Sequence, residues 1–97
     1  MNISTDKLIQ KILDFMAVLY HCYASTTHSE DRIIYAKDIA AAMGWIVELK
    51  EKGDVKTIID KILSPETDKH FGDYWRQGEW GDKEADALKK LKSEIKA

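Results

Sequence analysis

The sequence predicts an all-α fold, a compact array of four to five helices that residues 1–97 form as a single domain. Apolar residues recur at three- and four-residue spacing along most of the chain, which is the period of an amphipathic helix. No segment alternates between apolar and polar residues as a half-buried strand does. Capping residues, a proline and a glycine also divide the helical pattern into separate pieces.

The composition is that of a folded protein. Hydrophobic residues make up 44% of the chain and charged residues 33%, which is typical of globular rather than disordered proteins. Cys22 is the only cysteine, so it cannot form an internal disulfide. The first residues lack the features of a signal peptide, and no apolar run approaches the roughly 18 residues that a membrane span needs. We therefore expect a cytoplasmic protein without a membrane span.

Two long helices come first. One is expected over residues 5–23, where two adjacent apolar stripes form one broad face for burial. The other is expected over residues 30–52. Thr27 and Glu30 have the spacing of a capping box at its start, and Gly53 can adopt the left-handed conformation that ends a helix. Its buried side is expected to contain Tyr35, Ile39, Ala42, Met43, Ile46 and Leu49.

Small residues also recur along this second helix at every fourth position, as Ala36, Ala40 and Gly44. A row of small side chains lets another helix approach closely, and a glycine inside a helix costs about 1 kcal/mol relative to alanine. We therefore predict a close helix crossing on this row. A kink at Gly44, or room for the side chain of Trp45, are the alternatives.

The third helix is expected over residues 55–63. Asp54 can cap its start, and Pro65 must end it, because proline disfavours helical geometry in the preceding residue and has no backbone N–H to donate. Pro65 also suits the first position of the next helix. We expect that fourth helix over residues 65–77.

The fifth helix is expected over residues 83–95. Gly78 to Gly81 are predicted to form the turn before it, and Asp82 its cap. Lysines dominate its second half, where positive charge opposes the negative end of the helix macrodipole.

The fifteen residues from Asp68 to Asp82 differ most from the rest of the chain. They hold four of the nine aromatic residues and three of the five glycines. They also lie in the most acidic part, because residues 66–86 carry seven acids against three bases, a net charge of −4. Tryptophan, tyrosine and arginine dominate binding hot spots, and a negative surface suits a basic partner. We therefore expect a partner-binding surface formed by Asp73, Tyr74, Arg76, Glu79, Trp80 and Asp82.

The same aromatic residues also have a structural interpretation. Phe71 and Trp75, with their neighbours Tyr74 and Trp80, can pin a short helix and a turn onto the long helices, because each aromatic ring buries some 150–250 Å². The two interpretations are compatible within one segment.

No group of residues specifies a reaction. His21 and Cys22 are adjacent in sequence and would point in different directions on a helix, with the thiol on the apolar stripe. Asp68, His70 and Asp73 are the tightest cluster of metal-ligating types, but only the last two can share a helix face, and zinc needs three or four ligands. No carboxylate has a sequence context that would raise its pKa for acid–base catalysis. We therefore predict no enzyme activity, no metal site and no cofactor.

Charge also disfavours nucleic acid as a partner, because the lysines of residues 87–97 are few and follow the most acidic segment. We predict a small non-catalytic protein that binds and neutralises a partner protein with a basic surface or cleft. Bacterial immunity proteins, antitoxins and phage-encoded inhibitors work in this way. One alternative is a homo-oligomeric structural or regulatory subunit that associates through the second helix. The other is a protein that sequesters a small ligand, such as a nucleotide, in a pocket lined by Trp45, Tyr35 or Tyr20.

Overall fold

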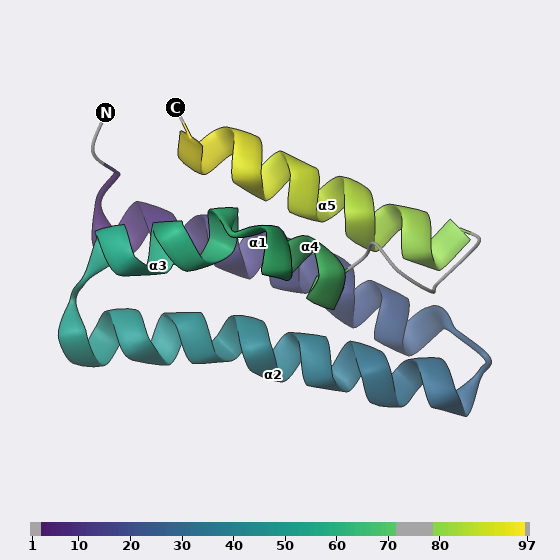
Figure 1. Ribbon diagram of the computed structural model, residues 1–97. Coiled ribbons are helices and arrows are strands. Elements are labelled where there is room, and N and C mark those ends of the chain that lie inside the picture. The colour runs from purple at the N-terminus through teal and green to yellow at the C-terminus, as the bar shows by residue number, and fades with distance from the viewer. Residues whose placement is uncertain (1–2, 72–78, 97) are drawn as a thin grey trace.

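Five helices and no strand form the part of the chain that the structure describes, which confirms the predicted all-α fold. The computed structural model describes residues 3–71 and 79–96, without the side chains of residues 68–70 and 79–82. The helices are α1 (Thr5–Ser25), α2 (Ser29–Lys52), α3 (Val55–Leu63), α4 (Pro65–Phe71) and α5 (Glu79–Lys96) (Figure 1). No helix in these residues is long and apolar enough to cross a membrane.

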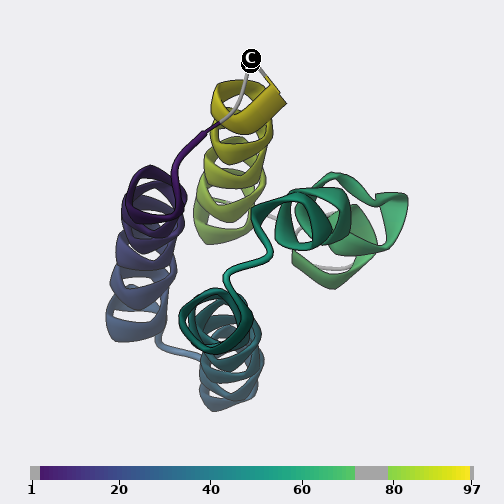
Figure 2. The same ribbon diagram turned by 90° about the vertical axis from the view of Figure 1, so that its left-hand side faces the viewer.

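α1 packs against two neighbours, α2 and α5. α3 and α4 follow each other closely and together fill the fourth corner of a four-helix arrangement (Figure 2). α3 packs against α2, and both short helices contact α5. The principal neighbours of α2 are therefore α1 and α3, both on the same side of it (Figures 1 and 2).

One hydrophobic core joins all five helices. The apolar stripes predicted for the first helix supply much of it. The buried apolar residues of the core are Leu8, Ile12, Phe15, Met16, Leu19, Ala42, Leu49, Ile58, Ile62, Phe71, Leu88, Leu91 and Ile95.

Side-chain caps fix the starts of α1 and α3. The Ser4 hydroxyl accepts a hydrogen bond from the Lys7 amide at 3.2 Å. The Asp54 carboxylate accepts two, from the Thr57 hydroxyl at 2.7 Å and the Thr57 amide at 3.1 Å. These bonds hold the pKa of Asp54 below its ordinary value of 3.8, because they stabilise the charged form. Gly53 ends α2 in the predicted left-handed conformation, with φ of 67°.

The predicted capping box at the start of α2 is wrong. The helix begins at Ser29, and its N-cap residue, His28, makes no side-chain capping hydrogen bond. Instead, the hydroxyl of the buried Thr26 accepts a hydrogen bond from the His28 amide at 3.3 Å, which stabilises a turn just before the helix. This local turn places the helix start between the predicted pair, Thr27 and Glu30.

The predicted helix crossing on the small-residue row is also wrong within this chain. Ala36, Ala40 and Gly44 are all exposed, and a Cβ atom added at Gly44 would meet nothing within 4 Å. Met43, expected on the buried side, is exposed as well. The reason is that α1 and α3 both cover the opposite side of α2. The fully buried residues of α2 are Tyr35, Asp38, Ala42 and Leu49.

The last two helices differ from their predicted limits. The described part of the fourth helix ends at Phe71, and the rest of the predicted range 65–77 lies outside the described residues. α5 begins at Glu79, so residues 79–81 belong to its first turn and Asp82 lies inside the helix instead of capping it. Acidic residues in a first turn favour this longer helix, because they face the positive end of its macrodipole.

Ion pairs connect neighbouring helices in the part of the chain that the structure describes. Lys11 of α1 meets Glu94 of α5 at 2.7 Å, and Lys61 of α3 meets Glu48 of α2 at 3.1 Å. The hydrogen bond to Glu94 raises the pKa of Lys11 above its ordinary value, because it favours the charged ammonium.

Candidate protein-binding surfaces

The predicted acidic aromatic surface falls largely on residues that the structure does not describe. Asp73, Tyr74 and Arg76 lie outside the described residues. Glu79, Trp80 and Asp82 lie in the first turn of α5, where the backbone is described and the side chains are not. The surface therefore remains a prediction, now placed between the end of α4 and the start of α5.

The beginning of this segment is anchored in the core. The buried ring of Phe71 lies 5.3 Å from the ring of Phe15 in an edge-on contact, and 5.3 Å from that of Trp45. These three rings join α1, α2 and α4. The structural role predicted for Phe71 is therefore confirmed, whereas Trp75 lies outside the described residues.

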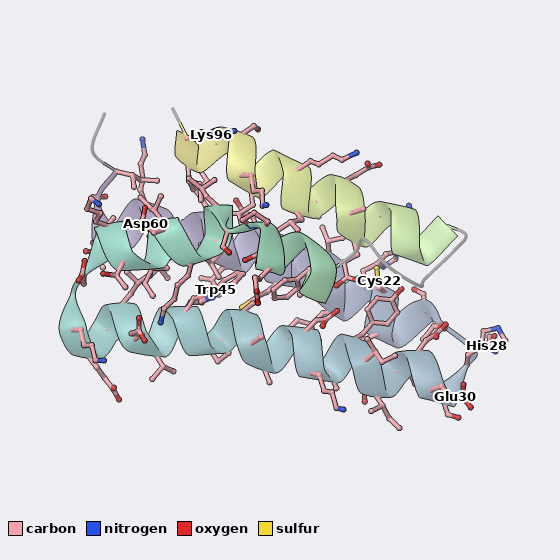
Figure 3. All side chains as sticks on the ribbon, viewed as in Figure 1. Cys22, His28, Glu30, Trp45, Asp60 and Lys96 are labelled. Carbon is pink, nitrogen blue, oxygen red and sulfur yellow. The ribbon has the colours of Figure 1, made fainter. Side chains whose placement is uncertain are left out.

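The aromatic residues proposed to line a small-ligand pocket have other positions. Trp45 lies on the side of α2 that faces α3 and α4, against the two phenylalanine rings (Figure 3). Tyr35 is buried, and Tyr20 is 53% exposed on α1. The rings of Trp45 and Tyr35 thus contribute to the core, and Tyr20 lies on the surface apart from them.

The outer side of α2 is a second candidate surface, and sequence reasoning did not identify it as exposed. Ile33 is 59% exposed, Val47 47% and Met43 41%. Residues 33, 40 and 47 are seven positions apart, so they follow one line along the helix, close to the middle of the side opposite the core. We call this surface the α2 seam, and it consists of Ile33, Ala36, Ala40, Met43, Gly44 and Val47.

The seam is unusual for a helix on the surface of a protein. A helix at the edge of a fold normally carries apolar residues toward the core and polar residues toward solvent. α2 carries apolar residues on both sides, and no other helix of the described chain lies beyond its outer side (Figure 1). Contiguous exposed apolar patches of this kind mark interaction surfaces.

The charges of α2 are separated along its length. Glu30 and Asp31 lie in the first turn, and Lys50 and Lys52 in the last. Glu30 marks the N-terminal end of the helix in Figure 3. Each pair stabilises the helix by opposing its macrodipole, and together the pairs give α2 an acidic end and a basic end.

A groove between α1 and α5 is a third candidate, with a volume of about 460 Å³. Lys83 and Lys90 line it together with His21 and Asp86, and it is open to solvent. His21 and Lys83 already have interactions within the protein. Its mixed charge and open shape do not define a ligand, and we base no function on it.

Among the described residues, two carboxylates are buried, which was not predicted from the sequence. Glu84 is fully buried and Asp38 is 1% exposed. Both have interaction partners within the protein, as buried charged groups require. Spacing could have revealed them, because Asp38 lies four residues before the buried Ala42, and Glu84 four before the buried Leu88.

Among the residues that the structure describes, no group of three or more histidine, cysteine, aspartate or glutamate side chains could hold a metal ion. Cys22 is fully buried in α1, which agrees with its predicted position on the apolar stripe.

In comparisons with known proteins, no family model, no curated sequence and no solved structure matches this chain.

Proposed function

We propose that the protein is a non-catalytic binding protein that covers and neutralises a partner protein with a basic surface or cleft, in the manner of immunity proteins, antitoxins and phage inhibitors. One observation carries the proposal. Residues 66–86 combine seven acids and three bases with four aromatic residues, whereas residues 1–65 are nearly neutral, with nine acids and eight bases. The negative charge is thus concentrated where the aromatic residues are.

The described residues around the segment support this use of it. Glu66 and Asp86, which lie just before and after the stretch from Asp68 to Asp82, are exposed and add to the negative charge there. Glu84 is buried and does not add to it. Phe71 fixes one end of the segment to the core, and the regular helix α5 fixes the other. A binding segment held at both ends loses less conformational entropy when it binds.

The mode of action would be obstruction of the partner. Acidic side chains at the rim attract a basic surface and raise the association rate. Trp80, Tyr74 and Arg76 would then supply the buried contacts that slow dissociation. A nuclease or another enzyme with a basic cleft for phosphates is the class of partner that this chemistry fits. Contact of this kind needs no catalytic group in the protein itself.

The test is an affinity pull-down from the native host with four baits. These are the wild type, Trp80→Ala, the double variant Glu79→Lys/Asp82→Lys and the control Asp6→Lys/Asp60→Lys. The control carries the same change in net charge at exposed positions of α1 and α3. We expect the wild type and the control to retain one basic protein that the other two baits lose. The wild type should also inhibit the activity of that protein.

The proposal fails if all four baits retain the same proteins to the same extent. It also fails if the retained protein keeps its full activity when the wild type saturates it. Circular dichroism of each variant shows whether the helical fold is intact, so that loss of binding is not confused with loss of structure.

A further inference from the structure

We infer that the α2 seam is a self-association surface, on which two copies of the chain pack α2 against α2 in antiparallel orientation about Ala40. The seam lies on the opposite side of α2 from the core, and it contains none of the residues 66–86 on which the proposed function rests. The two proposals therefore stand or fall separately.

The first argument is the shape of the seam. Ile33 and Val47, at its two ends, are large, and the small residues Ala36, Ala40 and Gly44 lie between them. Nothing within 4 Å would meet a side chain at Gly44. The distance between two packed helices depends on the side chains at their contact. The small residues at the centre therefore allow the backbone of another helix to approach closely. The large residues at the two ends then pack against that helix on either side of the crossing.

The second argument is that the seam is complementary to itself. When two copies of α2 run in opposite directions and cross at Ala40, residues equally far from position 40 face each other. Ile33 then faces Val47 of the other copy, because each is seven residues from the centre. Ala36 likewise faces Gly44, four residues from the centre. Ile33 thus meets a large residue and Ala36 a small one, and the twofold symmetry is that of most homodimers. Met43 lies at the level of Lys37 of the other copy, whose methylene stem is apolar.

The third argument is charge. In the antiparallel arrangement the acidic first turn of one helix, with Glu30, lies beside the basic last turn of the other, with Lys50. Both residues are exposed and flank the apolar seam. A parallel arrangement would place like charges together at both ends, which is unfavourable. The charges therefore select a second copy in antiparallel orientation as the occupant of the seam.

This arrangement also explains the small-residue row. The spacing of Ala36, Ala40 and Gly44 suits a close helix crossing, yet none of the helices in the described part of the chain crosses there. A second copy supplies the crossing helix. The apolar residues on both sides of α2 are then both used, one side in the core and the other between the two copies.

The first experiment measures mass against concentration. Sedimentation equilibrium of the full chain up to about 1 mM should show a mass that rises from 11.1 kDa toward twice that value. Ala40→Glu places two like charges together at the twofold axis and should weaken dimerisation at least tenfold, equivalent to about 1.4 kcal/mol. Ala17→Glu makes the same substitution at an exposed position in the middle of α1 and should dimerise as the wild type does.

The second experiment tests the register by disulfide formation between introduced cysteines. Ala40→Cys should cross-link to itself under mild oxidation. Val47→Cys should not, because the two copies of residue 47 would lie roughly 21 Å apart along the helix axis, well beyond disulfide reach. A mixture of Ile33→Cys and Val47→Cys should form the mixed dimer. The wild type is the background control, because Cys22 is buried.

A protein that stays monomeric at every concentration, or an Ala40→Glu variant that dimerises as the wild type does, would overturn the inference. Self-linking of Val47→Cys would replace the antiparallel arrangement with a parallel one. A wild type that remains monomeric and instead captures a different protein through the seam would also overturn it, since the occupant would not be a second copy.

Discussion

Replacement of Phe71 by alanine should destabilise the protein strongly, because its ring joins three helices. The ring is buried and lies 5.3 Å from the rings of both Phe15 and Trp45. Buried phenylalanine to alanine changes cost about 3–5 kcal/mol through lost transfer energy and the cavity that remains. A chain of this size has a total stability of about 5–15 kcal/mol, so the variant would lose a large part of it.

Urea denaturation followed by circular dichroism measures this loss as a shift of the urea midpoint. In a thermal melt, a loss of about 3 kcal/mol corresponds to a fall in melting temperature of roughly 12–24 °C for a domain of this size. Phe71→Leu keeps most of the apolar volume and loses the ring contacts, so it should cost less than about 1.5 kcal/mol. The two variants separate the cavity from the loss of aromatic contacts.

Tyr20→Ala is the matched control, because its ring is aromatic too but 53% exposed. We expect it to change the free energy of unfolding by about 0.5 kcal/mol or less, as surface substitutions do. If Phe71→Ala costs no more than Tyr20→Ala, then Phe71 does not connect the aromatic segment to the core.

Three further predictions concern α2, α3 and the contact between α1 and α5. Ala42→Leu should lower the free energy of unfolding by about 1–3 kcal/mol through overpacking. The exposed Ala40→Leu should change it by no more than about 0.5 kcal/mol in dilute, monomeric protein. Equal urea midpoints for the two variants would contradict this. The pKa of Asp54 is below 3.8 in the folded state, so its ionic contribution to stability is complete above that pH and is lost as the pH falls through the lowered pKa. The advantage of the wild type over Asp54→Asn, measured by urea midpoints, should therefore shrink in acid and not grow. Lys11→Glu should lower the melting temperature by breaking the bond to Glu94, and the exchanged pair Lys11→Glu/Glu94→Lys should recover part of the loss; a double variant no more stable than the single one would contradict the role of this pair.

Much of the fold follows from local signals in the sequence. Gly53 and Pro65 mark helix ends through their own backbone chemistry, and the Asp54 cap depends on a residue only three positions away. Such features do not depend on where other helices lie. The limits of the second and third helices were therefore predicted to within one residue, although Thr26 displaced the expected cap of the second.

The orientation of α2 could not be predicted in the same way. Its sequence has one apolar side around Leu49 and another through Ile33 and Val47, and periodicity alone does not say which of them meets a neighbour. The positions of α1 and α3 decide this. The buried Asp38 adds to the difficulty, because a carboxylate within the inner stripe obscures the apolar pattern there.

The predicted binding surface follows from the sequence only in part. Its composition was readable from the sequence, as were the anchor at Phe71 and the acidic charge. The start of α5 at Glu79 was not, because Gly81 and the expected Asp82 cap both favoured a turn. How Tyr74, Arg76 and Trp80 are displayed depends on contacts that local signals do not encode.

The association rate of the purified partner at increasing salt concentration is the most direct test of the proposed function. If the acidic segment steers a basic partner, Glu79→Lys/Asp82→Lys should bind about tenfold or more slowly at low salt, and its rate should depend less on salt than that of the wild type. The control Asp6→Lys/Asp60→Lys should keep a rate much closer to the wild-type value and a similar salt dependence. Equal rates and equal salt slopes for all three proteins would contradict the proposal that this segment is the binding surface.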